Sequence, residues 1–527
     1  MIEKCKTTRR GFLAGAVASA GVLALPRGTH AQSKPTDPTS RALFDATDAA
    51  LNGGKGFIGR NNETGTLGWG GSYTMQAYLL MYLAHRDTIY LDKLVAHIDA
   101  VLAQRDSARG VKDYRGQSLP AWRAMFDYTC GSVILNDAQG RPSLEIRTAV
   151  RPASDVAVSI GAGSKSGTFK LTATKNPDNS DDGPVVDVYD DLGPTSAAAA
   201  EQINREFVRI NGTPAGARAM ITAVSASADA GPPAPAGPVP LVAGPYVFAV
   251  HTGQITYPIV GFVRVVHETP SLHAKYKAKA DEDLIAVEQA LAVSDAEWRE
   301  DERTGEGWYV WAKGSPAAFD GAELPHNQFL AVGRTMIHLA ALPVTQREKY
   351  KSWATKMART FKNDLTLDDT GAYVWPYFWS KGWGHKGWRE SDNVSEYQPM
   401  MVHPKVGGHK NIEDTSHAHL DVDFASLAFE NNLGVFDETD MKRFAATFTR
   451  NVLTNKAGKP TTFSNVNGTG GKGSADTIAA GWMPLAKYDE RIFASVKEIY
   501  ANREMPRPDR AVALLMGLAY LNWYAHS

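Results

Sequence analysis

The sequence contains very little cysteine. Cys5 and Cys130 are its only thiols, and Cys5 lies in a segment that we expect to be removed on export. The mature chain therefore cannot form an internal disulfide. Its stability must come from the packing of apolar side chains.

Positive and negative charges are also nearly balanced. Lysine and arginine total 56 against 57 acidic residues, for a formal net charge of −1. This balance argues against a nucleic-acid-binding surface as the main function. A hydrophobic fraction of 43% is ample for a large core. The 527 residues exceed one ordinary domain, which favours a large domain with an additional module.

Long hydrophobic runs are absent. The one apolar stretch near the N-terminus, residues 14–25, is too short to span a bilayer as an anchor. It follows the heptapeptide TTRRGFL at residues 7–13, which resembles a twin-arginine export signal, and Thr29 and Ala31 offer a cleavage site. We expect a signal peptide over residues 1–31 and a periplasmic or secreted protein without stable membrane insertion after cleavage.

Helical hairpins recur along most of the chain. In residues 73–84 the apolar side chains Tyr73, Ala77, Leu80, Met81 and Ala84 follow helical spacing, and a second amphipathic helix follows at residues 89–104. Similar pairs occur at residues 255–293, 326–365, 416–453 and 475–503, with a further helix at 510–524. In the clearest copies the first helix is more apolar than the second.

Repeated hairpins can stack into an open solenoid or close into a ring. Uniform repeats would favour the solenoid, whereas these repeats vary in length and long polar loops precede the first helices. We therefore expect a mainly α fold, an incomplete or complete (α/α) toroid of helical hairpins. It would comprise residues 39–130 and 248–527.

A segment of different composition interrupts the helices at residues 134–247. Residues 155–160, 167–174 and 185–189 are typical of strands, and the proline-rich residues 231–240 form a semi-rigid linker. The sequence predicts an inserted, mostly β module. A carbohydrate-binding or packing role is open, and nothing in the segment indicates catalysis.

The stretch of residues 383–423 concentrates ionisable and aromatic groups. Five of the fourteen histidines lie between His385 and His419. If Asp414 caps the following helix, His417 and Asp421 are one turn apart, while His417 and His419 diverge by roughly 200°. No H-E-x-x-H or cysteine pattern occurs. We therefore predict no metal or cofactor, with a divalent metal in this stretch as the open alternative.

Aromatic residues on polar loops suggest a saccharide cleft, because an indole ring is a flat surface for the apolar face of a sugar. The alternative is that they cap the core. The candidate substrate-binding residues are Trp69, Tyr73, Tyr257, Trp308, Trp311, Trp375, Trp379 and Trp383.

Several polar residues could carry acid–base chemistry. The amide of Asn327 could hydrogen-bond a substrate carboxylate, or could cap a helix, and Arg389 could form bidentate contacts with a carboxylate. Tyr397 could act as a base or acid near positive charge. The full set of candidate catalytic residues is His326, Asn327, Arg389, Tyr397, Glu413, His417 and His419.

The hairpins, the aromatic residues and the Asn/His/Tyr/Arg set resemble the six-hairpin α/α-toroid polysaccharide lyases and uronyl epimerases. The resemblance is one of architecture and residue types. It implies that Asn327 and Arg389 neutralise a uronate carboxylate, with Tyr397 and His417 as base and acid. The expected partner is an acidic polysaccharide or oligosaccharide, cleaved by β-elimination.

Other functions remain open. A glycoside hydrolase would need a carboxylate pair, and a uronyl epimerase would use the same groups without cleavage. A non-catalytic periplasmic glycan-binding protein would depend on the tryptophans and not on the acid–base residues. The candidate hydrolase carboxylates are Glu306, Glu323, Glu413, Asp414, Asp421 and Asp423.

Overall fold

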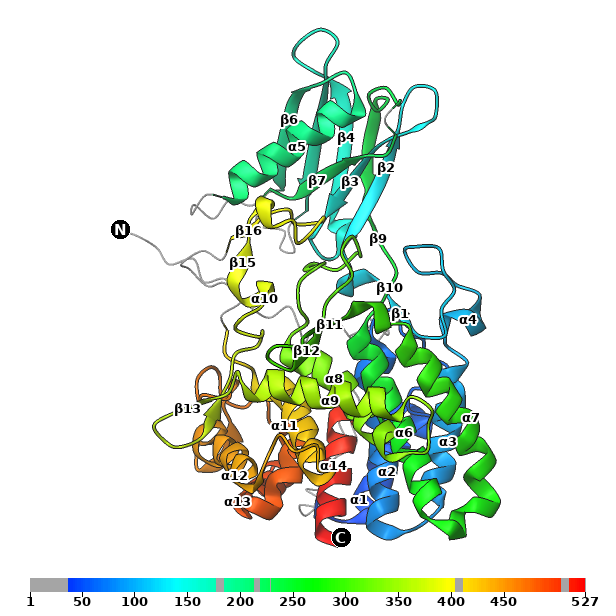
Figure 1. Cartoon of the computed structure of the whole chain (residues 1–527), viewed down its shortest axis with the longest axis vertical. Coiled ribbons are helices and arrows are strands. Elements are labelled where there is room, and N and C mark those ends of the chain that lie inside the picture. The colour runs from blue at the N-terminus through cyan, green and yellow to red at the C-terminus, as the bar shows by residue number, and fades with distance from the viewer. Residues whose placement is uncertain are drawn as a thin grey trace, which may run out of the picture.

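The computed structural model describes residues 37–176, 184–212, 219–227, 229–402, 411–503 and 511–526. The predicted signal peptide at residues 1–31 lies outside this part, and so do His403 and His409. Figure 1 shows a helical body at the bottom and a smaller β-rich part above it.

The predicted helical hairpins are present in the body. The paired helices are α2 (Ser72–His85) with α3 (Ile89–Leu102), α6 (Ala249–Glu268) with α7 (His273–Ala292), α8 (His326–Ala341) with α9 (Arg347–Lys362), and α11 (Thr415–Glu430) with α12 (Glu438–Ala446). Near the C-terminus lie α13 (Arg491–Ala501) and α14 (Ala511–His526), and α1 (Arg41–Ala50) begins the body. Residues 475–485, expected to be α-helical, instead lead into the 3-10 helix η9 (Ala479–Tyr488), which contains Pro484.

The two helices of a hairpin differ in burial as their sequences predict. In α9 the buried apolar residues Tyr350, Ala354, Met357, Ala358 and Phe361 follow helical spacing along one face. In α8 nearly every side chain is buried. The first helices therefore form the interior and the second helices cover them.

The buried helices contact one another in sequence. α2 packs on α6, α6 on α8, α8 on α11, α11 on η9, η9 on α14, and α14 on α2. The contact between α6 and α8 is close at Gly253, where an added Cβ would lie 2.6 Å from the backbone nitrogen of Val332. A side chain at this position would force the helices apart.

The β-rich part has its own core. One sheet has the strand order β7 (Ile221–Ser225), β3 (Pro142–Thr148), β2 (Gly131–Asn136), β9 (Val242–Ala243). The other has the order β6 (Val185–Leu192), β5 (Phe169–Lys175), β4 (Val156–Ala162), β8 (Ala236–Pro240). Alternate residues of β4 and β5 are buried, and they join Ile203 of helix α5 (Ser196–Asn211) in one apolar cluster.

The mainly α toroid is therefore wrong as the class of this fold. Helices make up 49% and strands 18% of the structure, which is mixed α/β. Besides the two four-stranded sheets, two-stranded antiparallel pairs lie in the loops of the body. They are β1 (Arg123–Ala124) with β10 (Tyr246–Val247), β11 (Trp298–Asp301) with β12 (Glu306–Tyr309), β13 (Thr366–Leu367) with β14 (Tyr373–Val374), β15 (Gly387–Trp388) with β16 (Met401–Val402), and β17 (Leu453–Lys456) with β18 (Lys459–Thr462). Strands of two to four residues are too short to show a two-residue period, which is why the sequence did not indicate them.

The stretch between β15 and β16 attaches the β-rich part to the body. Arg147 of β3 donates to Glu396 over 2.8 Å, and its guanidinium lies 5.3 Å from the ring centroid of Tyr397. The Tyr397 ring is buried with Cys130 and Ala318. These contacts fix the two parts of the molecule against each other.

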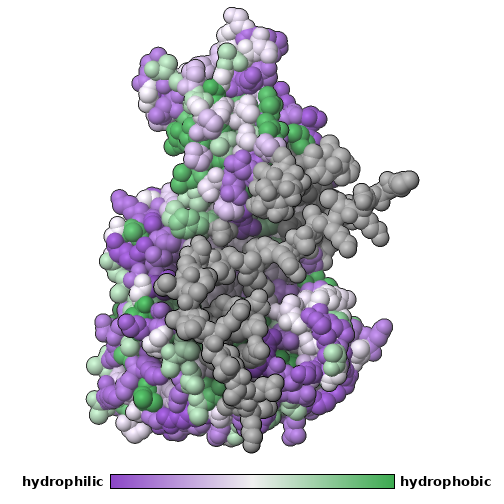
Figure 2. All heavy atoms as spheres, turned by 180° about the vertical axis from the view of Figure 1, so that it is seen from behind, coloured by the Kyte–Doolittle hydropathy of each residue, from purple (hydrophilic) through white to green (hydrophobic). Residues whose placement is uncertain are grey.

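Among the described helices, none is long and apolar enough to cross a membrane. Hydrophobic residues do reach the surface of the β-rich part, the narrow upper region of Figure 2. They include Ile134, Val185, Val186, Val188 and Val242.

Candidate functional site

Three segments that are distant in sequence lie side by side at the start of α11. The Glu413 N–H donates to the Trp375 carbonyl over 3.0 Å, and the Tyr377 N–H donates to the Asn411 carbonyl over 2.8 Å. On the other side, the Val466 N–H donates to the Glu413 carbonyl over 3.1 Å. This short ladder holds the side chains of Tyr377 and Glu413 beside the first turn of the helix.

Asp414 caps α11 and also binds its first histidine. Its Oδ1 accepts the backbone N–H groups of Ser416 (2.9 Å) and His417 (3.0 Å), as an N-cap residue does. Its Oδ2 lies 2.5 Å from Nδ1 of His417. When the imidazole is neutral, this contact places the proton on Nδ1 and leaves Nε2 as the acceptor.

The two groups of this pair shift each other's titration. Burial alone would raise the pKa of Asp414, but the imidazolium of His417 and its hydrogen bonds hold that pKa below the ordinary 3.8. Burial would lower the pKa of His417, but the Asp414 carboxylate raises it above 6.5. His417 is therefore a stronger base than an isolated histidine.

Helix α8 brings two amides to the same place. Nδ2 of Asn327 donates to Oε2 of Glu413 over 3.2 Å, and the side chains of Asn327 and Gln328 lie close enough to the Tyr377 hydroxyl to affect its pKa. Oδ1 of Asn327 and Oε1 of Gln328 are buried and accept no hydrogen bond from the described residues. Burial raises the pKa of Tyr377, so its phenol keeps its proton.

Beneath these groups lies a second carboxyl. Asp421, one turn along α11 from His417, accepts a hydrogen bond from Nε1 of Trp375 over 2.8 Å and lies close enough to Glu413 for each carboxyl to affect the pKa of the other. Both carboxyls are fully buried. Burial, together with their mutual repulsion, raises the pKa of Glu413, and burial raises that of Asp421.

Aromatic rings form the walls around His417. The ring centroids of Trp69 and Tyr377 lie 6.1 Å and 6.0 Å from that of His417, both in edge-on orientations. Trp69, Tyr377 and His417 are each half-buried. The cluster therefore borders solvent on the side of these three rings.

A second histidine stands behind Trp69. The His251 ring lies 6.0 Å from that of Trp69, and its Nδ1 is 3.2 Å from Nδ2 of Asn62. Burial lowers the pKa of His251 to about 3, so it is neutral at ordinary pH. Gly68 lets this ring pack, because an added Cβ would lie 2.8 Å from His251 Cδ2.

The structure thus brings together part of the predicted set, namely Asn327, Glu413, His417 and Trp69. Residue-by-residue reasoning missed Asn62, His251, Gln328 and Tyr377 as members of the cluster. One signal could have found His251 and Gln328, because both lie at the start of a buried helix, as Asn327 and His417 do.

Four predicted catalytic residues point elsewhere. His326 is fully buried with Nε2 2.8 Å from Asp364, and Tyr397 packs against the β-rich part. Arg389 is exposed beside the 3-10 helix η7 (Glu390–Asp392). His419 lies on the other side of α11 from His417, where Nδ1 is 2.5 Å from the Ser416 carbonyl and the ring faces that of Tyr73.

Most of the predicted sugar-binding aromatics pack against other groups. The rings of Trp308 and Trp379 lie 4.4 Å apart, and Trp311 stacks on Phe319. Trp383, by contrast, is 38% exposed. The guanidinium of Arg334 lies over the ring of Tyr257, 4.2 Å from the centroid of that ring. Of the eight candidates, Trp69 faces the cluster directly and Trp375 supports it through Asp421.

Glu413, Asp414 and His417 could also hold a metal, since their ligand atoms lie within 4.8 Å of one another. Several of these atoms already have hydrogen-bond partners, while Nε2 of His417 has none among the described residues. Nδ1 of His417 is bound to Asp414, and both oxygens of Glu413 accept N–H groups, from Asn327 and from the backbone of Asp414.

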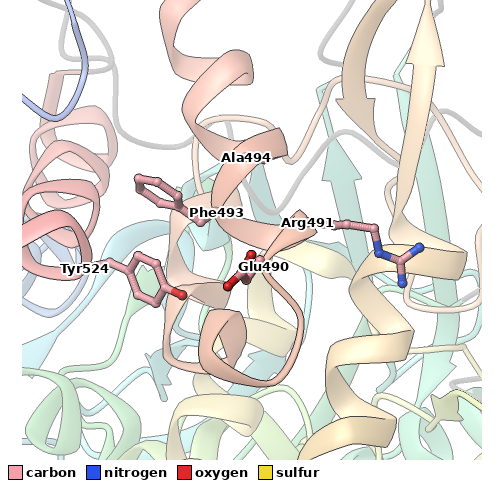
Figure 3. A pocket seen from close by; sticks show the side chains of 5 residues that line it. All are labelled: Glu490, Arg491, Phe493, Ala494 and Tyr524. Carbon is pink, nitrogen blue, oxygen red and sulfur yellow. The ribbon is translucent and has the colours of Figure 1, made fainter.

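A hollow in the body lies away from this cluster. It has a volume of about 470 Å³ and is bordered by Glu490, Arg491, Phe493, Ala494 and Tyr524. Figure 3 shows the rings of Phe493 and Tyr524 on neighbouring helices, with the Glu490 carboxylate beside Tyr524. It contains none of the cluster's residues.

Comparison with known proteins gives no relative. No protein family, no curated protein and no solved structure matches the chain.

Proposed function

We propose that this protein is an exported enzyme that cleaves a uronate-containing glycan by β-elimination. The observation that carries the proposal is the His417–Asp414 pair beside the Tyr377 phenol, with the amide of Asn327 next to them. A base, an acid and a carboxylate-binding amide are the groups that this reaction requires.

In the proposed reaction, the amides of Asn327 and Gln328 hydrogen-bond the uronate carboxylate and stabilise the charge that develops on it. Nε2 of His417 removes the C5 proton, and the C–H electron pair forms the C4–C5 double bond as the C4–O bond breaks. The Tyr377 hydroxyl gives its proton to the leaving oxygen. Each turnover then returns one proton from His417 to Tyr377 through solvent.

The environment of each group supports its role. The Asp414 carboxylate makes His417 more basic, and burial keeps Tyr377 protonated and able to donate. Trp69 offers a half-buried indole beside His417 on which a sugar ring could stack.

Hydrolysis has less support because the candidate carboxylates are already engaged. Glu306 is bound by Lys381 over 2.8 Å, Glu323 accepts the Trp383 N–H over 2.6 Å, and Asp423 is bound by Arg334 over 2.9 Å. Glu413 and Asp421 are fully buried, and Asp414 is bound to His417.

The test is to incubate the purified protein with a panel of uronate polysaccharides and to follow ultraviolet absorbance and product masses. An unsaturated product from wild type, lost in His417→Ala and Tyr377→Phe, supports β-elimination. New reducing ends without absorbance indicate a hydrolase. Deuterium uptake at C5 without chain cleavage indicates an epimerase, and binding without any product indicates a glycan-binding protein.

A further inference from the structure

Two histidines lie together where α14 packs against α2. His85 is the final residue of α2, and His526 is the final residue of α14. The two helices contact each other, and α14 ends at the bottom of the helical body (Figure 1). The ring centroids of the two histidines are 4.7 Å apart, and the ring planes are tilted by 52°. Because His85 is half-buried and His526 is exposed, the pair is open to solvent.

One asparagine sets the tautomer of both rings. Nδ2 of Asn522 donates to the Leu518 carbonyl over 2.9 Å, and Oδ1 of the same amide lies 3.0 Å from Nε2 of His85. An amide oxygen only accepts, so the proton of a neutral His85 is on Nε2. The Asn522 carbonyl lies 2.9 Å from Nδ1 of His526. In the same way, it places the proton of that ring on Nδ1.

Each neutral ring therefore keeps one nitrogen with a free lone pair, Nδ1 in His85 and Nε2 in His526. Neither nitrogen has a hydrogen-bond partner in the described part of the chain. A histidine that binds a metal commonly donates its other ring N–H to an oxygen of the protein, which fixes the ring and raises its basicity. Asn522 provides such an oxygen to both rings.

The separation of the two rings also suits a shared metal ion. With nitrogen–metal bonds of about 2.1 Å, the ring centroids of a His–metal–His unit lie about 4.5 to 5.2 Å apart for bond angles of about 90° to 110°. The observed 4.7 Å falls within this range. The competing explanation is that each histidine stabilises the C-terminal end of its own helix as a cation. Two imidazolium rings at this separation repel each other, so that explanation accounts for one histidine but not for the pair.

We propose that Nδ1 of His85 and Nε2 of His526 bind one late first-row divalent metal ion, such as Zn²⁺ or Cu²⁺, with water in the remaining positions. Imidazole nitrogen suits these ions, whereas Mg²⁺ and Ca²⁺ prefer oxygen. The ion ties the end of α14 to the end of α2. His85 lies at the opposite end of the 14-residue helix α2 from Trp69, about 20 Å along its axis. The site is therefore structural and does not depend on the proposed glycan cleavage.

The test is calorimetric titration of the purified protein, free of any histidine tag, with ZnCl₂ at neutral pH. His85→Ala and His526→Ala should each lower the affinity of one zinc site by about 10-fold or more. The double variant should lose no more than either single variant, because one remaining imidazole does not form the site. His267→Ala, which changes a histidine bound to Asp281 over 2.9 Å, is the matched control and should bind zinc as wild type does. Zinc should also raise the melting temperature of wild type by about 2 °C or more, and that of neither variant.

Equal zinc affinity in wild type and in both single variants overturns the proposal, and so does a wild type that binds no zinc. If His85→Ala does not fold, His526→Gln, a change at an exposed position, takes its place, and wild-type zinc affinity in that variant is the same contradiction. One equivalent of Cu²⁺ gives an independent measurement by electron paramagnetic resonance. The spectrum of wild type should show coupling to two imidazole nitrogens and that of His526→Ala to one, whereas identical spectra overturn the proposal. The presence or absence of lyase activity changes none of these outcomes.

Discussion

Asp414 binds His417 twice. One oxygen accepts the backbone N–H of His417 at 3.0 Å and the other lies 2.5 Å from its Nδ1. The carboxylate that starts helix α11 therefore also orients the imidazole of its first turn. Helix capping and acid–base chemistry depend on the same side chain.

This double role predicts a separation of stability from activity in Asp414→Asn. Asparagine is as good an N-cap as aspartate, so the melting temperature should change by less than about 3 °C. The negative charge of the carboxylate beside His417 is lost, and kcat should fall by roughly 100-fold or more. Calorimetry and initial rates measure the two effects. Asp437→Asn, the same change at the cap of α12, should leave the rate unaltered.

The His417–Asp414 pair also sets the pH dependence of the reaction rate. His417 must be neutral to accept a proton, and the Asp414 carboxylate raises its pKa above 6.5. The rate constant kcat/KM should therefore be low at acid pH and should rise as pH increases through a midpoint above 6.5. In Asp414→Asn that midpoint should move to lower pH. A midpoint that is the same in both proteins would show that another group titrates.

The sequence favours Tyr397 as the catalytic tyrosine, whereas the structure favours Tyr377. One substitution at each position distinguishes the two. Tyr377→Phe removes the hydroxyl near Asn327 and Gln328 and should lower kcat about 100-fold or more. Tyr397→Phe keeps the ring against Arg147 and should stay within about 3-fold of wild type. The reverse ranking of the two rates would place the reaction at Tyr397.

Buried histidines predict instability in acid. Burial lowers the pKa of His251 and of His419 to about 3 from an ordinary 6.5. The unfolded chain then binds more protons than the folded chain between these values, so stability falls as pH falls from 6.5 towards 3. Each histidine contributes a slope of about 1.4 kcal/mol per pH unit. Urea unfolding at several pH values measures it, and His419→Gln should reduce the slope.

The helical elements could be predicted from the sequence, and the directions of many side chains could not. Helical spacing identified α9 and its partners because one buried face repeats over several turns. The position of Asn327 at the start of α8 placed it correctly near the cluster. Its neighbour His326 points the other way, to Asp364, because successive residues of a helix diverge by about 100°.

Long-range contacts account for the remaining differences. Tyr377 reaches His417 because residues 375–377 lie along residues 411–413, a pairing that no local pattern in either segment predicts. Tyr397 lies in the same stretch, residues 383–423, as His417. Its ring nevertheless packs against Arg147 of the β-rich part. Short strands such as β15 and β16 depend on tertiary contacts in the same way.

The most direct test of the central claim is the absorbance of the products formed from a panel of uronate polysaccharides by wild type and by His417→Ala. The proposed reaction predicts an unsaturated uronate at the new non-reducing end, formed by wild type and reduced at least 100-fold in the variant. Cleavage without that absorbance, or no unsaturated product across the panel, would contradict β-elimination at His417.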